Sequence, residues 1–136
     1  MRYKKLIIVG ITILVIGFLL GGLFVTKNTI NIESVNVGEA IFKYAGNNIS
    51  HTLSHQELIV IENIFNGKML YKDNPSCGFT ENVCVRFDGS QTFCFACDTC
   101  PIIYWKEGNK YFKISEEEKQ QLYELLGEYG FHFPCV

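Results

Sequence analysis

Charged side chains are absent from the twenty positions between Leu6 and Val25. Lipid hydrocarbon about 30 Å thick is crossed by roughly twenty helical residues, so this run has the length of one membrane span. A buried helix of a soluble domain would need protein on every face, and a chain of 136 residues has little to cover it with. We therefore expect a transmembrane helix, bordered by the basic residues Arg2, Lys4, Lys5 and Lys27.

The same run lacks the features of a removable leader. Its end has no small-x-small cleavage site, and no cysteine follows it directly to accept a lipid. A signal peptide usually has an apolar core of only about 7 to 15 residues, which favours an uncleaved signal-anchor over a cleaved leader. Three of the four flanking basic residues precede the span, and loops rich in lysine and arginine stay in the cytoplasm. Residues 1–27 thus predict a cytoplasmic basic tip and a signal-anchor in the cell membrane, with the rest of the chain outside.

Basic residues are scarce after this anchor. All 14 acidic residues of the chain lie beyond position 27 but only 8 of the 12 basic ones do, so the body carries a net charge of −6. Nucleic-acid binding needs a basic stripe against the phosphates, and an acidic body lacks one. We therefore expect no nucleic acid as a partner, only the membrane, through residues 6–25, and a protein.

Catalytic motifs are missing as well. No Gly-x-Ser-x-Gly elbow and no paired-carboxylate motif frames His51, His55 or His132, although nucleophilic and acid–base catalysis depend on such neighbours. We expect no enzymatic activity and no cofactor. Aromatic residues, by contrast, make up 14% of the chain, which favours a folded domain over a disordered stalk.

Capping signals, turn residues and apolar periodicity divide the body into short elements. Two Ser-x-x-Glu capping boxes begin helices at Ser54 and Ser115, and Asp88-Gly89 marks a hairpin turn. The expected elements are a hairpin over 40–53, a helix over 55–65, strands over 83–87 and 92–95, a hairpin over 102–114, and a helix from 115 to about 129. We predict an α+β domain over residues 40–136, joined to the anchor by a tether over residues 28–39. Its antiparallel sheet has four to six strands, with two helices packed on one face.

Six cysteines lie in the body: Cys77, Cys84, Cys94, Cys97, Cys100 and Cys135. An even count in a small exported domain predicts structural disulfides, although six cysteines allow 15 pairings. A three-residue loop at the Asp88-Gly89 turn would place Cys84 opposite Cys94, whereas a two-residue loop would favour Cys97 as the partner of Cys84. Cys135 must reach back to the body, with Cys77 or Cys100 as its natural partners.

The spacing Cys94-x-x-Cys97-x-x-Cys100 also permits a role in chemistry. An iron–sulfur cluster would need a fourth cysteine where Tyr104 stands. A thioredoxin-like pair using Cys97 or Cys100 needs a helix N-terminus, whereas the residues that follow indicate a strand. Zinc held by the three thiolates and His132 would compete with their oxidation outside the cell. A thiol–disulfide redox or metal-handling role for this cluster is the alternative to structural disulfides.

Four aromatic residues of the last expected hairpin form a candidate binding face: Tyr104, Trp105, Tyr111 and Phe112. Successive side chains of a strand point to opposite faces, so half of them point away from the helices if only one face is covered. An exposed aromatic stripe in an acidic surround is typical of a protein-binding face. The alternative is that both faces are covered, by the helices and by the cysteine cluster.

Three stretches of the C-terminal half carry a resemblance. They are Cys77-Gly78-Phe79, Phe93-Cys94-x-Ala96-x-Asp98-x-Cys100-Pro101 and Tyr129-Gly130-Phe131-x-Phe133-Pro134-Cys135. This pattern resembles short single-pass bacterial membrane proteins with a C-terminal cysteine-rich domain, and the resemblance implies a small anchored, exported domain without implying any chemistry. The expected function is that of a membrane-anchored, extracytoplasmic and non-enzymatic domain that presents a protein-binding or inhibitory surface.

Overall fold

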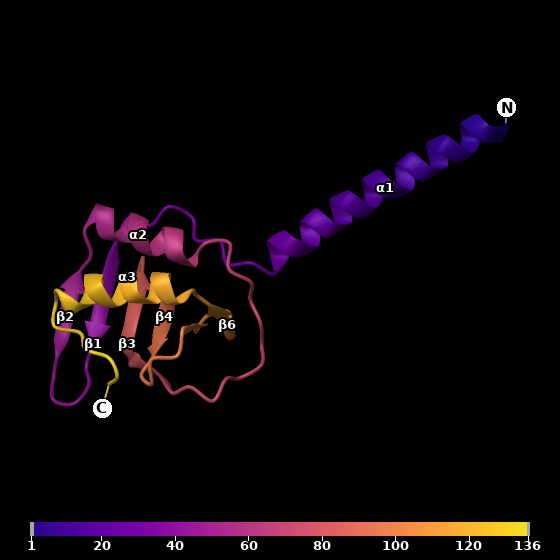
Figure 1. Ribbon diagram of the computed structural model, residues 1–136. Coiled ribbons are helices and arrows are strands. Elements are labelled where there is room, and N and C mark those ends of the chain that lie inside the picture. Colours follow the sequence, from indigo (N-terminus) through magenta and orange to yellow (C-terminus); the bar gives the residue numbers. More distant parts are fainter. Residues whose placement is uncertain (1, 136) are drawn as a thin grey trace.

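The computed structural model describes residues 2–135, with side chains described for residues 7–22 and 28–135. An antiparallel sheet of six strands has the order β2-β1-β3-β4-β5-β6. Helices α2 and α3 lie across one face of this sheet, and helix α1 extends away from the body (Figure 1). The predicted α+β body with two helices on one face of the sheet is confirmed. The elements are α1 (Arg2–Lys27), β1 (Gly38–Phe42), β2 (Ile49–Thr52), α2 (His55–Phe65), β3 (Phe79–Phe87), β4 (Gln91–Ala96), β5 (Ile102–Trp105), β6 (Lys110–Lys113) and α3 (Glu116–Gly127).

Helices α2 and α3 begin at the two predicted capping boxes. The Ser54 hydroxyl accepts a hydrogen bond from the Glu57 N–H at 3.4 Å, and the Glu57 carboxylate accepts one from the Ser54 N–H at 2.5 Å. Ser115 and Glu118 repeat the pattern at 3.2 and 2.7 Å. Each box satisfies two backbone donors that the start of a helix otherwise leaves unpaired. These local signals explain why both helix starts were predictable.

The turn between β3 and β4 has the three-residue loop that brings Cys84 opposite Cys94. Asp88 and Gly89 both take positive φ values, +47° and +68°, as tight hairpin turns often require. A slip of one residue would turn every side chain of the strand to the other face. The predicted register is therefore confirmed, and it places both cysteines on the face of the sheet that α2 and α3 do not cover.

Phenylalanines dominate the main core between the sheet and helices α2 and α3. Phe65 of α2 is fully buried, with its ring centroid 5.1 Å from those of Phe93 and Phe112 and 6.5 Å from that of Phe87. Aromatic pairs at such separations stabilise a core beyond their buried area alone. Phe65 thus joins α2 to strands β3, β4 and β6 at once.

The segment between α2 and β3, residues 66–78, covers the β6 edge of the sheet. Tyr71 and Tyr111 exchange both of their backbone hydrogen bonds, each at 2.9 Å. Met69 makes a second antiparallel bridge, with Thr29. An uncovered strand edge is a template for pairing with another chain. The α2–β3 segment therefore protects this edge and joins the chain that follows α1 to the sheet.

Residues 28–39, expected to form a tether, are bound to the body. The Ile30 N–H donates to the Lys68 carbonyl at 2.8 Å, and the Ile30 side chain is 3% exposed. The Val35 N–H donates to Glu62 Oε1 at 2.8 Å, and the Val35 side chain is buried. Ile30 and Val35 are thus core residues, whereas Val37 is exposed, and the two buried side chains make the segment a fixed connection between α1 and the sheet.

Helix α1 extends from the body as a separate rod (Figure 1). Its large apolar side chains, where described, are exposed, from 50% for Ile16 to 84% for Phe18. Within the described part of the chain, none of the helices has the length and apolar character that a membrane crossing requires. The side chains of the predicted basic flanks, and of both ends of the predicted span, lie outside the described residues.

Candidate functional site

Strand alternation divides the four predicted binding-face residues between the two sides of the sheet. Tyr104 lies opposite Tyr111 on the side away from α2 and α3, with ring centroids 4.9 Å apart. Trp105 and Phe112 point to the other side, where Trp105 packs against the main core and Phe112 is part of it with no exposed surface. This corrects the predicted face: Phe112 cannot meet a partner, because helix α2 covers its side of the sheet.

Tyr104 and Tyr111 belong to an aromatic cluster that also contains Tyr71 and Phe79. Ring centroids lie 5.8 Å apart for Phe79 and Tyr104, 5.5 Å for Phe79 and Tyr111, and 5.9 Å for Tyr71 and Tyr111. The Tyr111 hydroxyl donates to Asn74 Oδ1 at 3.0 Å. Satellite clusters of this kind typically lie under long loops. Here the cluster holds the α2–β3 segment on the sheet, and this segment, not the cysteine cluster of the predicted alternative, packs on Tyr111.

A hollow of about 390 Å³ lies beside Tyr104 and the buried Cys94. At its rim Glu81 forms an ion pair with Lys106, whose Nζ lies 2.8 Å from Glu81 Oε2. Burial first, and then the neighbouring Tyr111, raises the pKa of the Tyr104 phenol, so this hydroxyl stays protonated and donates to Asn109 Oδ1 at 3.2 Å. The rim carboxylate already has a basic partner, and the hollow therefore offers no free charge to a ligand.

A pocket of about 300 Å³ lies beside Trp105 and the β3–β4 turn. We call it the Trp105 pocket. Ligand pockets in proteins begin at about this volume, so it has room for one long side chain or a small molecule. Its apolar walls are formed by Ile30, Ile32, Val35, Phe87, Phe93 and Trp105, and its polar lining by Asn31, Glu33, Asp88 and Gln91.

Three contacts hold the Trp105 indole in place. Its Nε1–H donates to Gln91 Oε1 at 2.7 Å, and its ring is stacked near Phe93 at an interplanar angle of 14°, with centroids 6.4 Å apart. Gly108, in the β5–β6 turn, packs directly on the ring: a Cβ at that position would lie 2.2 Å from Cε3 of the indole. These contacts fix the orientation of the indole, so the aromatic wall of the pocket is preorganised. A side chain at Gly108 would displace the indole.

The charge of the Trp105 pocket is entirely negative. Glu33 and Asp88 line it, and no basic side chain does. One Asp88 oxygen, Oδ1, accepts from the backbone N–H groups of Asn36 and Val37 at 3.3 and 3.1 Å. Glu33 is exposed, and within the described residues its carboxylate has no ion-pair partner. The pocket thus combines an aromatic wall with a carboxylate that is not paired with any of the described basic side chains.

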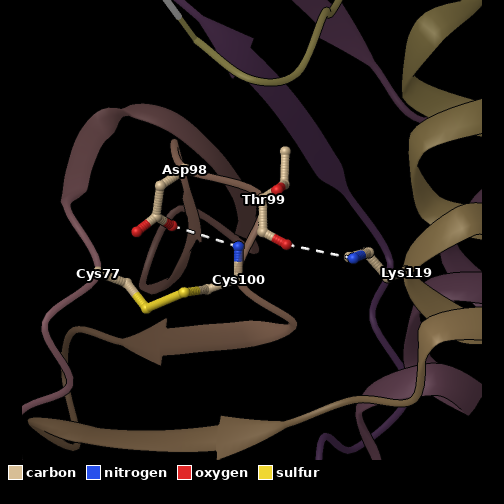
Figure 2. Close-up of a disulfide and its surroundings, with 5 residues drawn as sticks. All are labelled: Cys77, Asp98, Thr99, Cys100 and Lys119. Atoms are coloured by element: carbon tan, nitrogen blue, oxygen red, sulfur yellow. Dashed lines mark hydrogen bonds between the residues drawn. A yellow bond between two sulfur atoms is a disulfide. The ribbon is translucent and has the colours of Figure 1, made fainter.

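One disulfide is formed, between Cys77 and Cys100. It joins the segment before β3 to the loop before β5, as Figure 2 shows. In that loop the Cys100 N–H donates to Asp98 Oδ1 at 3.2 Å, and the Thr99 carbonyl accepts from Lys119 Nζ at 3.2 Å. The bridge and these bonds fix the loop between the sheet and α3. Cys77 and Cys100 are therefore bonded to each other. The predicted pairing of Cys135 with one of them is wrong.

The other four cysteines have free thiols. Burial raises the pKa of Cys84 to about 11 and that of Cys94 to about 12. Burial, followed by the contact with Cys97, raises the pKa of Cys135 to about 12. Thiols with such pKa values are almost wholly protonated near pH 7, the opposite of a reactive thiolate.

The predicted ligand set of Cys94, Cys97, Cys100 and His132 is not brought together. Among the described residues, the one group of metal-binding side chains within ligand distance is Cys77, Asp98 and Cys100, and two of its three sulfur or oxygen ligands are already joined to each other in the disulfide. His132 lies against Phe42, with ring centroids 4.9 Å apart. In this arrangement Cys100 is therefore not free to act as a thiolate ligand beside Cys94 and Cys97.

Several pocket residues had no signal in the sequence. Glu33 and Asn31 lie in a segment without clear periodicity, and Gln91 is one polar residue at the start of a strand. Phe79 of the aromatic cluster was missed for another reason: the β3–β4 pairing shifts between Phe79 and Cys84, so simple alternation along β3 fails there.

The chain matches no protein-family model, no curated protein and no solved structure.

Proposed function

We propose that this protein is a membrane-anchored, non-enzymatic domain outside the cytoplasm, and that it binds a basic side chain of a protein partner in the Trp105 pocket. The observation that carries this proposal is the composition of the pocket, which has an aromatic wall, two carboxylates and no base. The anchor places the domain, and the pocket supplies the recognition.

The anchoring part of the proposal rests on helix α1. Twenty uncharged residues between Leu6 and Val25 lie within a single helix. The large apolar side chains described for this helix are exposed and are not covered by the body. Exposing apolar surface to water costs about 25 cal/mol for each Å², so a rod of this kind is stable only in lipid or against other protein. The excess of basic residues before it favours a cytoplasmic N-terminus, and the Cys77–Cys100 disulfide fits an oxidising exterior.

The connection after α1 supports a body held close to the bilayer. Ile30 and Val35 are buried in the body and bonded to it within a few residues of Lys27. Because the same segment supplies Ile32 and Glu33 to the Trp105 pocket, the pocket lies on the part of the body that the anchor joins. A partner bound there would be an exposed segment of a protein at the membrane surface.

The chemistry of the pocket favours a basic side chain as its occupant. Lysine and arginine carry an apolar stem and a cationic head, which match the apolar walls and the Glu33 carboxylate. A cation over an aromatic face gains further stability, most of all over tryptophan. The net charge of −6 on the body attracts a basic segment over longer range.

The anchor is tested in intact cells with a C-terminal tag. Protease added outside is expected to remove the body, and alkaline carbonate is expected to leave the full chain in the membrane pellet. The double variant Leu14→Arg/Phe18→Arg should lose membrane retention, because arginine near the centre of a span costs about 2.5–3.5 kcal/mol per residue. Leu14→Ala/Phe18→Ala is the matched control and should be retained. A tag that resists protease until the cells are lysed would contradict the proposed orientation.

The pocket is tested through Trp105, the one tryptophan of the chain. Titration of the full-length protein in detergent with N-acetyl-arginine amide should shift the indole fluorescence, and the uncharged citrulline analogue should not. Glu33→Gln should weaken arginine binding about two- to fivefold, the worth of a partly exposed ion pair. Glu128→Gln removes the same charge at the far end of α3 and should leave binding unchanged. Equal responses to both ligands would refute recognition of a basic group.

A second variant tests the aromatic wall of the same pocket. Gly108→Ala must displace the indole, because the new Cβ would overlap the ring, and it should abolish the fluorescence response to arginine. Gly78→Ala is the control, since a Cβ there meets nothing within 4 Å. An unchanged response in Gly108→Ala would show that the indole does not form the binding wall.

A thiol–disulfide or metal-handling role receives less support. Such roles need an accessible thiolate or a set of free thiolates. The pKa values of Cys84, Cys94 and Cys135 are raised by burial, and Cys100 is bonded to Cys77. These observations favour a structural use of the cysteines.

A further inference from the structure

We infer that the four free cysteines form two further disulfides, Cys84–Cys94 and Cys97–Cys135, so that the mature body carries three bridges with a single connectivity. Each pair is already brought together by the fold, across β3 and β4 in one case and between the C-terminal tail and the end of β4 in the other. The inference rests on the proposed function in one respect only, the location of the body outside the cytoplasm. There the thiols meet oxidants that a cytoplasmic protein does not.

Cys84 and Cys94 occupy a pair of positions suited to a disulfide. They lie directly opposite in the β3–β4 register. The carbonyl of Asn82 accepts from Lys43 N–H and the Asp88 N–H donates to Val37 O, so even-numbered residues of β3 direct their backbone groups toward β1. The carbonyl of Thr92 accepts from the Lys106 N–H, so even-numbered residues of β4 direct theirs toward β5.

It follows that Cys84 and Cys94 form a non-hydrogen-bonded pair. Opposite Cα atoms in such pairs lie about 4.5 Å apart with their side chains closest together, within the range of about 4.4–6.8 Å found for disulfides. Both side chains are buried, and Ile41 of the neighbouring strand β1, opposite Cys84, completes a small apolar cluster with them. A bridge at this site needs no rearrangement of the strands.

Cys97 and Cys135 are brought together by the C-terminal tail. The Cys135 N–H donates to the Cys97 carbonyl at 2.9 Å, so the two residues lie next to each other. The tail is held there by its aromatic residues: Phe133 stacks on Tyr123 with centroids 4.1 Å apart, and Phe131 packs on Phe42 at 5.0 Å. Cys135 is completely buried, so Cys97 is the partner within its reach.

The chemistry is a pair of thiol–disulfide exchanges with a disulfide oxidant, either a protein thiol oxidase of the exterior or oxidised glutathione. One cysteine loses its proton and attacks the oxidant, which releases one thiolate and leaves a mixed disulfide. The second cysteine loses its proton and displaces the other thiolate, which closes the protein bridge. For each bridge two cysteines are oxidised, and one oxidant disulfide is reduced to two thiols that take up the two protons.

The test uses the full-length protein, reduced while unfolded in urea and then refolded in detergent with oxidised glutathione, so that the thiols are accessible before the core closes. After denaturation, alkylation should find no free thiol. Cleavage by trypsin at Arg86, by chymotrypsin at Phe79 and Phe95 and by Asp-N before Asp98 separates all the relevant cysteines, and mass spectrometry should identify peptides linked as 77–100, 84–94 and 97–135. A link between Cys84 and Cys97, or two or more thiols left in the oxidised protein, would overturn the inference.

Paired variants give a matched control for the connectivity. Cys84→Ala/Cys94→Ala removes one proposed bridge completely and should leave no alkylatable thiol. Cys84→Ala/Cys97→Ala removes one member of each bridge and should leave two, at Cys94 and Cys135. Two free thiols in the first variant and none in the second would refute the pairing.

The same mapping on protein from native membranes separates this inference from the proposed location. Bridges that form with glutathione but are absent in the cell would refute an oxidising location while leaving the pairing intact. Other links in both samples would refute the pairing while leaving the location intact.

Discussion

Phe65→Ala is expected to lower the free energy of unfolding by about 3–5 kcal/mol, the usual cost of replacing a buried phenylalanine by alanine. Phe65 has no exposed surface, and its ring contacts Phe87, Phe93 and Phe112. The variant leaves a cavity where α2 meets three strands, in a domain whose whole stability is on the order of 5–15 kcal/mol. Urea unfolding followed by the fluorescence of Trp105 measures the loss without a signal from α1, which has no tryptophan.

The matched control for this prediction lies on the same helix. Ile59 is 43% exposed, and Ile59→Ala removes apolar side-chain atoms from the solvent face of α2 with an expected loss under about 1 kcal/mol. Both variants place the same good helix former in α2, so the difference between them isolates core packing. Similar losses for Phe65→Ala and Ile59→Ala would mean that the helix does not pack on the sheet through Phe65.

Loss of the Cys77–Cys100 bridge is expected to lower the free energy of unfolding by about 3 kcal/mol. The two cysteines are separated by 23 positions, and closing a loop of this length restricts the unfolded chain by that order. The bridge also fixes the loop whose Thr99 carbonyl accepts from Lys119 of α3. The measurement is urea unfolding of Cys77→Ser/Cys100→Ser against the natural chain without reductant.

A reductant supplies the control. With the bridge reduced in the natural chain, both proteins lack the same constraint, and their unfolding midpoints should converge whatever the state of the other cysteines. A difference that persists in reductant would assign the loss to the serine side chains and contradict the constraint as its cause.

Much of the body could be predicted because its signals are local. The capping boxes at Ser54 and Ser115 involve residues three positions apart, and the strands show their alternation over a few residues. The opposition of Cys84 and Cys94 depended on one further condition, the length of the Asp88-Gly89 loop, and the structure has the three-residue form. Where elements follow from neighbouring residues in this way, the sequence specifies them without reference to the rest of the fold.

The candidate site followed from the sequence only in part. Trp105 was expected in a binding surface, but its pocket also requires Glu33 and Gln91, which no local pattern connects to it. Half of the four aromatic residues were expected to point away from the helices, and Tyr104 and Tyr111 do so, but the α2–β3 segment covers Tyr111 through Tyr71 and Asn74. A strand predicts which side chains share a face, but not which distant segment will cover that face.

By itself, the sequence determined the helix that contains the uncharged residues 6–25, the two capped helices, the antiparallel hairpins and the acidic character of the body. Tertiary structure alone decided that Cys77 is bonded to Cys100, that Cys135 lies next to Cys97, and that Ile30 and Val35 pack into the core. The physical reason is range. Capping, turn and alternation energies act between residues a few positions apart, whereas these contacts join segments tens of residues apart and form only when the whole core closes around them.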